Sequence, residues 1–214
     1  MAERRTETAG TENRRKKIFF VMGKSASGKD TIYKKILEQF PYLKTVIPYT
    51  TRPRREGEEE GVEYHFTERE ILADMEAEGR VIEIREYETI YGPWSYATVD
   101  DGQIDLERDS YVMIGTLESY ESIRRYFGQA YTVPIYIEVE DGERLQRALD
   151  REKKQKTPKY AELCRRFLAD EKDFSEEKLS VAGIRSEDRY ENLDISECLR
   201  QIGERIVSHF PHQG

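Results

Sequence analysis

The chain has 214 residues, 36% of them charged, and a formal net charge of −8. This length fits one domain with room for a lid, and the negative balance disfavours nucleic acid and anionic membrane surfaces as partners. The longest apolar runs are about five residues, far below the roughly 20 that a membrane-spanning helix needs, so we expect a soluble, cytoplasmic protein.

The cysteines and histidines predict no site. Cys164 and Cys198 lie far apart and have no Cys-x-x-Cys or histidine partner nearby, a spacing that favours ordinary helical thiols over a disulfide framework or a zinc site. His65 falls in a strand-like stretch, and His209 and His212 fall in what we interpret as a terminal tail.

Structure is expected to begin at residue 16. Residues 1–15 are polar and rich in Arg, Glu and Thr, a composition that predicts a disordered tail. An apolar run at 18–22 predicts a buried strand, and residues 31–39 carry apolar side chains at helical spacing. Between them, residues 23–31 read Gly-Lys-Ser-Ala-Ser-Gly-Lys-Asp-Thr. A glycine-bounded loop between a strand and a helix is typical of a P-loop; the alternative is a purely structural loop.

The P-loop interpretation assigns a role to each loop position. Lys29 would reach the β and γ phosphates as a point charge. Asp30 stands where the strict pattern has Ser or Thr, with Thr31 one place later, and we assign both to Mg²⁺. The residues expected to bind the ATP phosphates through the loop are Gly23, Ser25, Ala26, Ser27, Gly28, Lys29, Asp30 and Thr31.

A second polar loop follows an apolar stretch at 43–47 that ends at Pro48. Three arginines, Arg52, Arg54 and Arg55, lie within four residues, and guanidinium groups crowded together suit an anionic phosphate. The alternative is a solvated loop of mixed charge, because Glu56 and the glutamates of 58–60 could neutralise the arginines.

A small β-rich insert is predicted next. Residues 62–66 alternate as in a short exposed strand, and 67–70 form a capping box that opens a helix ending near residue 78. Strands at 81–88 and 94–98 flank a Tyr-Gly-Pro turn.

The remaining chain alternates strands and helices. Strands are predicted at 111–114 and 133–139, and helices at 117–127, 141–152 (capped by Asp141), 160–174 and 196–208. This alternation predicts an α/β fold in which helices wrap a parallel sheet, with ligands at the carboxyl ends of the strands.

The order of the motifs resembles the guanylate kinase family. After the P-loop come Thr-Thr-Arg-x-x-Arg-x-Gly-Glu at 50–58 and Gly-x-Glu-Tyr-x-Phe at 61–66, and the similarity extends over about 18–206. The resemblance implies a three-layer P-loop kinase fold with an acceptor-binding insert at 49–98 and a helical lid at 141–174. The core would then comprise 16–48, 99–140 and 175–210, within a family domain spanning 16–210.

The resemblance also implies an acceptor site. Arg52, Arg55, Tyr64 and Tyr91 correspond to residues that grip the acceptor phosphate, and Glu58 would orient an arginine. Glu83 corresponds to the carboxylate that accepts from guanine N1–H and its 2-amino group. The alternatives without a ligand-binding role are that the tyrosines pack the insert and that Glu83 faces solvent.

On the ATP side, Arg147, Arg151 and Arg166 match the arginines of the lid, and Asn192 matches the asparagine near the adenine. Arg55 and the lid arginines join Lys29 as the expected catalytic residues. For Arg147 and Arg151, four residues apart on a helix, solvated salt bridges are the alternative.

Three departures from the family pattern fall in the acceptor site. Pro48 replaces a serine that donates to the guanine carbonyl, and Pro93 follows Tyr-Gly where the family has Ser or Thr. Ile114-Gly115-Thr116 occupies the place of an Asp-x-Asp pair.

The implied activity is Mg²⁺-dependent phosphoryl transfer from ATP to a nucleoside monophosphate, with GMP as the leading acceptor. Two alternatives stay open: a non-catalytic interaction or nucleotide-sensing module with this fold, and a kinase for another phosphorylated acceptor. Expected partners are nucleotides, without nucleic acid or membrane, and the chain is expected to act as a monomer or homodimer.

Overall fold

The computed structural model describes residues 16–89 and 92–210. The tail predicted at 1–15, Tyr91 and His212 therefore lie outside the described residues.

A five-stranded parallel sheet forms the centre of the molecule, in the order β2-β7-β1-β8-β9. Its strands are β1 (Ile18–Met22), β2 (Lys44–Thr45), β7 (Tyr111–Gly115), β8 (Thr132–Glu138) and β9 (Arg189–Glu191). The predicted α/β class and parallel sheet are thus confirmed.

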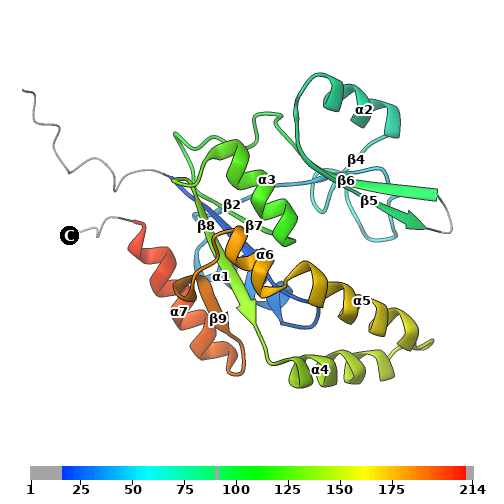
Figure 1. Ribbon diagram of the computed structural model, residues 1–214. Coiled ribbons are helices and arrows are strands. Elements are labelled where there is room, and N and C mark those ends of the chain that lie inside the picture. Colours follow the sequence, from blue (N-terminus) through cyan, green and yellow to red (C-terminus); the bar gives the residue numbers. More distant parts are fainter. Residues whose placement is uncertain (1–15, 90–91, 211–214) are drawn as a thin grey trace, which may run out of the picture.

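Helices cover both faces of this sheet (Figure 1). Successive side chains of a strand point to opposite faces, so Phe19 and Val21 pack with α1 (Lys29–Gln39) and α7 (Ile195–Ser208). Phe20 and its alternate neighbours pack on the other face, with α3 (Leu117–Phe127) and α6 (Glu176–Val181). The loop after β1 is therefore held between two packed layers.

A separate four-stranded sheet has the order β4-β3-β6-β5 and lies to one side of the core (Figure 1). It comprises β3 (Tyr49–Thr50), β4 (His65–Phe66), β5 (Val81–Thr89) and β6 (Gly92–Val99). The helix α2 (Arg69–Ala77) packs on it through Leu72, which joins Ala97 and Val99 in a small apolar cluster.

Helices α4 (Asp141–Lys153) and α5 (Tyr160–Asp173) follow each other as a hairpin at the opposite side from α2 (Figure 1). A short 3₁₀ helix (Ser186–Asp188) precedes β9. Cys164 is exposed on α5 and Cys198 is buried on α7. No helix within the described ranges is both long enough and apolar enough to span a bilayer.

The structure corrects two predicted helix caps. Helix α2 has Glu68 at its N-cap and no side-chain capping bond, because the Thr67 N–H donates to Thr50 O and keeps that residue beside the small sheet. Helix α4 is capped by Glu140, whose carboxylate accepts from the Glu143 N–H. Asp141 is instead engaged in ion pairs.

Other local predictions were also wrong. Helix α6 and strand β9 were not predicted, since each is too short to show a hydrophobic period. The strand predicted at 62–66 is confined to its last two residues. His209 does not lie in a loose tail: its ring packs edge-on against Phe19, and burial lowers the pKa of His209 to about 4.

Candidate active site

The loop between β1 and α1 is a closely packed turn. Ala26 has φ 63° and Gly28, at the N-cap of α1, has φ 87°. A Cβ on Gly28 would lie 2.4 Å from Asn192 Nδ2, and a Cβ on Gly23 would lie 2.5 Å from Ile137 O. Glycine is therefore required at both positions. A non-glycine residue such as Ala26 in the left-handed region costs about 1 kcal/mol and is typical of ligand-binding turns.

Asn192 fixes the loop from the end of β9. Its Nδ2 donates to Ser27 O at 2.8 Å, and the residue is 5% exposed. The asparagine expected near adenine thus lies against the loop backbone. The neighbouring Ser27 Oγ is buried and has no hydrogen-bond partner in the structure. An orphaned hydroxyl beside a helix N-terminus suits an anionic ligand such as a phosphate chain.

Lys29 lies in the first turn of α1. Its Nζ lies 3.7 Å from Asp30 Oδ2, and Lys29 and Asp30 both line a cavity of about 890 Å³. Asp30 and Thr31 are exposed. Within the described ranges, no cluster of three or more His, Cys, Asp or Glu side chains could hold a metal alone. This donor set fits Mg²⁺, which is commonly bound through one or two carboxylates together with substrate phosphates.

Arg52, in the loop after β3, is held by Glu58. Its two terminal nitrogens donate to the two Glu58 oxygens at 2.8 and 2.6 Å, and its guanidinium lies 5.0 Å from the Tyr64 ring centroid. Arg52 is 3% exposed. These hydrogen bonds lower the pKa of Glu58 to about 2. Arg52 is therefore a fixed charge in the loop, beside Tyr64 at the cavity wall.

Arg55 differs from Arg52. Its backbone N–H donates to Glu58 at 2.8 Å, but its side chain is exposed, and no hydrogen bond or ion pair to another described residue holds its guanidinium. Of these two loop arginines, Arg55 is the one available to a phosphate without breaking an ion pair.

Glu83, on β5, is buried at the floor of the same cavity and is not the solvent-facing residue that one interpretation allowed. Its oxygens accept hydrogen bonds from Thr98, Ser119 and Arg85. Thr116, where the Asp-x-Asp pair was expected, caps α3 by accepting from the Ser119 N–H. Pro48 also lines the cavity and supplies no donor to it.

The α4–α5 hairpin is anchored on the loop between β1 and α1 by a residue that the sequence analysis missed. Arg144 is 1% exposed and ion-pairs with Asp141, Asp170 and Glu171, while one of its nitrogens donates to Ser25 O at 3.3 Å. The loop adds contacts of its own: the Ser25 N–H donates to Asp170 at 2.8 Å, and Lys24 pairs with Glu171 at 2.8 Å.

The three predicted lid arginines also belong to this hairpin. Arg147 pairs with Glu143 at 2.9 Å and donates to Asn192 O at 3.0 Å. Arg166 lies 3.7 Å from Glu162, and its buried Nε has no hydrogen-bond partner among the residues that the structure describes. Arg151 and Arg166 line a small pocket beside Ser25. The structure thus places Arg151 and Arg166 near Ser25 of the loop between β1 and α1, and Arg147 against Asn192.

Two site residues were missed, and each had a weak signal in the sequence. Arg144 lies three residues after Asp141 and three before Arg147, so it shares a helix face with both. Arg85 lies two residues after Glu83 on one strand, so the two side chains share a face of the sheet. Neither spacing is rare enough to stand out alone.

Comparisons with known proteins agree with the resemblance that the sequence motifs indicated. A family model described as guanylate kinase matches residues 15–195. The guanylate kinase of Helicobacter hepaticus is 33% identical over 112 residues, covering 52% of this chain and 54% of that protein. The guanylate kinase of Chromobacterium violaceum is 31% identical over 136 residues, covering 62% of this chain and 61% of that protein. The chain therefore spans little more than half the length of these curated relatives.

The fold has a solved counterpart. The crystal structure of guanylate kinase from Anaplasma phagocytophilum matches with a TM-score of 0.61 and 18% sequence identity, covering 93% of this chain and 88% of that chain. At this identity the likeness shows a shared fold.

Proposed function

The chain belongs to the guanylate kinase family, and from that premise we propose that it transfers the γ-phosphoryl group of ATP to GMP, releasing ADP and GDP. One observation carries the proposal: Lys29 of the phosphate loop (residues 23–31) and Glu83 of the small sheet line the same cavity. Its volume of about 890 Å³ lies within the usual range for small-molecule sites. A phosphate donor on one wall can then meet a base-binding acceptor site on the other.

On the donor side, the phosphate chain of ATP lies on the backbone N–H groups of the loop, and Lys29 contacts the transferring group. Phosphoryl transfer needs positioning and charge neutralisation more than covalent chemistry. Asp30 and Thr31 provide oxygens for Mg²⁺, which when bound neutralises phosphate charge. Arg147, Arg151 and Arg166 add positive charge from the lid, and Asn192 keeps the loop in shape through its bond to Ser27 O.

On the acceptor side, Arg55 grips the phosphate of GMP together with Tyr64 and Tyr91, while Glu58 holds Arg52 in place beside Tyr64. Glu83 accepts from the guanine N1–H and 2-amino group. Adenine presents a lone pair at N1 instead and so offers no donor to Glu83 at this position, and that difference discriminates between the two bases.

The test is a coupled ADP-release assay with Mg-ATP and a panel of acceptors: GMP, dGMP, AMP, UMP, CMP and ribose phosphates. We expect GMP to give the highest kcat/KM, with Lys29→Ala inactive. A clear preference for AMP or a sugar phosphate would refute the guanine assignment and favour a kinase for another acceptor, an alternative that Pro48 and Thr116 at the cavity wall support. ATP binding without transfer to any acceptor would favour a nucleotide-sensing module.

A further inference from the structure

Both oxygens of the Glu83 carboxylate are engaged within the protein. Thr98 Oγ1 donates to Oε1 at 3.0 Å and Ser119 Oγ donates to Oε2 at 3.2 Å. Arg85 supplies the other two bonds: its Nε donates to Oε2 at 3.0 Å and a terminal nitrogen donates to Oε1 at 3.4 Å. A carboxylate has about four acceptor sites, so Glu83 has no acceptor site left for a ligand.

The donors differ in how readily they can leave. Thr98 and Ser119 are each 3% exposed and are fixed by the packing of β6 and α3. Arg85 has 22% of its side chain exposed and reaches Glu83 through a long, flexible stem. Its planar fork addresses both oxygens from one edge, which is the geometry that guanine N1–H and the 2-amino group would need. Arg85 and the base therefore require the same edge of Glu83.

We propose that Arg85 competes with the purine base for Glu83, and so sets how strongly the pocket prefers guanine over adenine. This inference rests on the proposed function, because it concerns the acceptor pocket. With Arg85 in place, Glu83 is masked and an adenine N1 lone pair does not face a bare carboxylate. For guanine to bind, Arg85 must leave.

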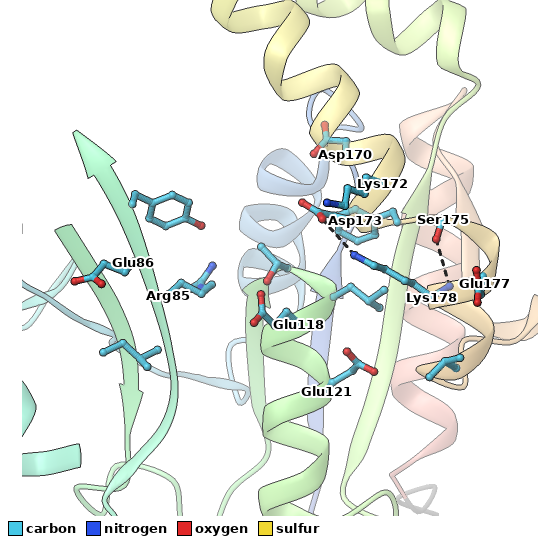
Figure 2. Close-up of a pocket in the computed structure, with 16 residues that line it drawn as sticks. Arg85, Glu86, Glu118, Glu121, Asp170, Lys172, Asp173, Ser175, Glu177 and Lys178 are labelled. Carbon is cyan, nitrogen blue, oxygen red and sulfur yellow. Dashed lines mark hydrogen bonds and ion pairs between the residues drawn. The ribbon is translucent and has the colours of Figure 1, made fainter. Parts of the chain in front are cut away.

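A displaced Arg85 side chain has acidic groups nearby. Arg85 also lines a second cavity of about 1060 Å³, between β5, α3 and the segment where α5 meets α6. Figure 2 shows Arg85 extending from its strand toward α3, with Glu118 facing it and Glu121 one helical turn further on. Lys178, on the far wall, is already paired with Asp173 at 3.3 Å. The α3 carboxylates can therefore stabilise the guanidinium after it leaves Glu83.

The proposal has a thermodynamic signature. Since Arg85 pairs with Glu83 only before the base binds, the cost of moving it falls equally on GMP and IMP, both of which use the Glu83 edge through N1–H. Removing Arg85 should therefore strengthen the binding of GMP and of IMP by the same factor. AMP, which gains nothing from a bare Glu83, should not improve.

The experiment is titration calorimetry of GMP, IMP and AMP on wild type and Arg85→Met, with Arg69→Met as the matched control. Arg69 pairs with Glu86 of the same strand at 2.7 Å but lies outside both cavities. We expect Arg85→Met to lower the Kd of GMP and of IMP by about tenfold, the equivalent of one net hydrogen bond, without improving AMP. Arg85→Lys, which keeps the charge but not the fork, should lie between.

Weaker GMP binding in Arg85→Met would mean that Arg85 contacts the base, and unchanged binding, or no binding to either protein, would mean that no competition exists. Each of these results overturns the proposal. Thermal melting of wild type, Arg85→Met and Arg85→Lys checks that the variants are folded, and Arg85→Lys keeps the proposal testable if Arg85→Met is not. Calorimetry does not depend on turnover, so failure of phosphoryl transfer in the acceptor panel is distinguished from failure of this inference.

Discussion

The cavity lined by Lys29 and Glu83 has two walls, and these differ in how far their polar groups are already paired. On the phosphate-loop wall, the 3.7 Å contact with Asp30 is the one ion pair of Lys29 among the described residues. Two residues earlier in the loop and outside the cavity lining, Ser27 Oγ has no hydrogen-bond partner among them. On the small-sheet wall, Glu83 accepts four hydrogen bonds. Next to Tyr64 of that wall, Arg52 is paired with Glu58. A ligand that binds the phosphate-loop wall contacts polar groups that have few partners within the protein. A ligand that binds the small-sheet wall must displace the partners that its polar groups already have.

One site can therefore combine two modes of recognition. Preformed groups favour tight binding with little rearrangement, while groups paired within the protein make binding depend on what the ligand offers in exchange. We therefore expect substitutions on the phosphate loop to abolish activity outright and substitutions on the small sheet to change selectivity.

The largest effect is expected for Lys29→Ala. Loss of this charge should weaken Mg-ATP binding by about 1.5–3 kcal/mol and reduce turnover further, because the charge also meets the transition state. Calorimetry and the ADP-release assay measure the two effects. Lys35→Ala, an exposed lysine further along α1 and outside the cavity, is the control. Unchanged ATP binding and turnover in Lys29→Ala would contradict the assignment of Lys29 to the ATP phosphates.

The second prediction concerns the contact of Arg144 on α4 with Ser25 of the phosphate loop. Arg144→Met removes the cation that three carboxylates of α4 and α5 share, leaving Lys24 paired with two of them. This substitution should lower the free energy of unfolding by roughly 2–4 kcal/mol. It should also weaken ATP binding and leave the base preference unaltered. Arg200→Met removes an exposed arginine from two ion pairs on α7 and should cost less than about 1 kcal/mol. Denaturant unfolding of the two variants compares them; equal losses would contradict the anchoring role.

The third prediction separates the two acceptor contacts. Glu83→Gln should weaken GMP by about 1–3 kcal/mol and lessen the preference for GMP over IMP, since the amide cannot accept from both donors of guanine. Arg55→Ala should weaken every phosphorylated acceptor and leave base preference intact. Steady-state kinetics across the acceptor panel distinguish the two patterns, and identical effects from both variants would contradict the assignment.

The smallest effect concerns acid stability. The pKa of Glu58 falls from 4.5 to about 2 through its hydrogen bonds with Arg52, so the carboxylate stabilises the fold above pH 4.5 and this contribution is lost as the pH falls toward 2. Glu58→Gln should show a flatter decline of melting temperature across this window than wild type. Parallel curves for the two proteins would mean that the Arg52–Glu58 pair does not stabilise the small-sheet wall.

The contrast between the walls also explains what the sequence could predict. The strand, turn and helix around Lys29 are specified by neighbouring residues, so the local pattern was sufficient to predict them. Partners distant in sequence were not predictable: Asn192 bonds to Ser27 across 165 positions and Arg144 to Ser25 across 119. The Glu83–Arg85 pair is local in sequence, yet only the packing of Thr98 and Ser119 around it shows that the carboxylate is saturated.

The most direct test of the account is phosphorus NMR of the wild-type protein mixed with equal amounts of Mg-ATP and GMP. The account predicts that the signals of ATP and GMP decline together while those of ADP and GDP rise in equal amounts, with no inorganic phosphate. ATP loss matched by inorganic phosphate, or spectra that do not change while calorimetry shows ATP bound, would contradict transfer between the two walls.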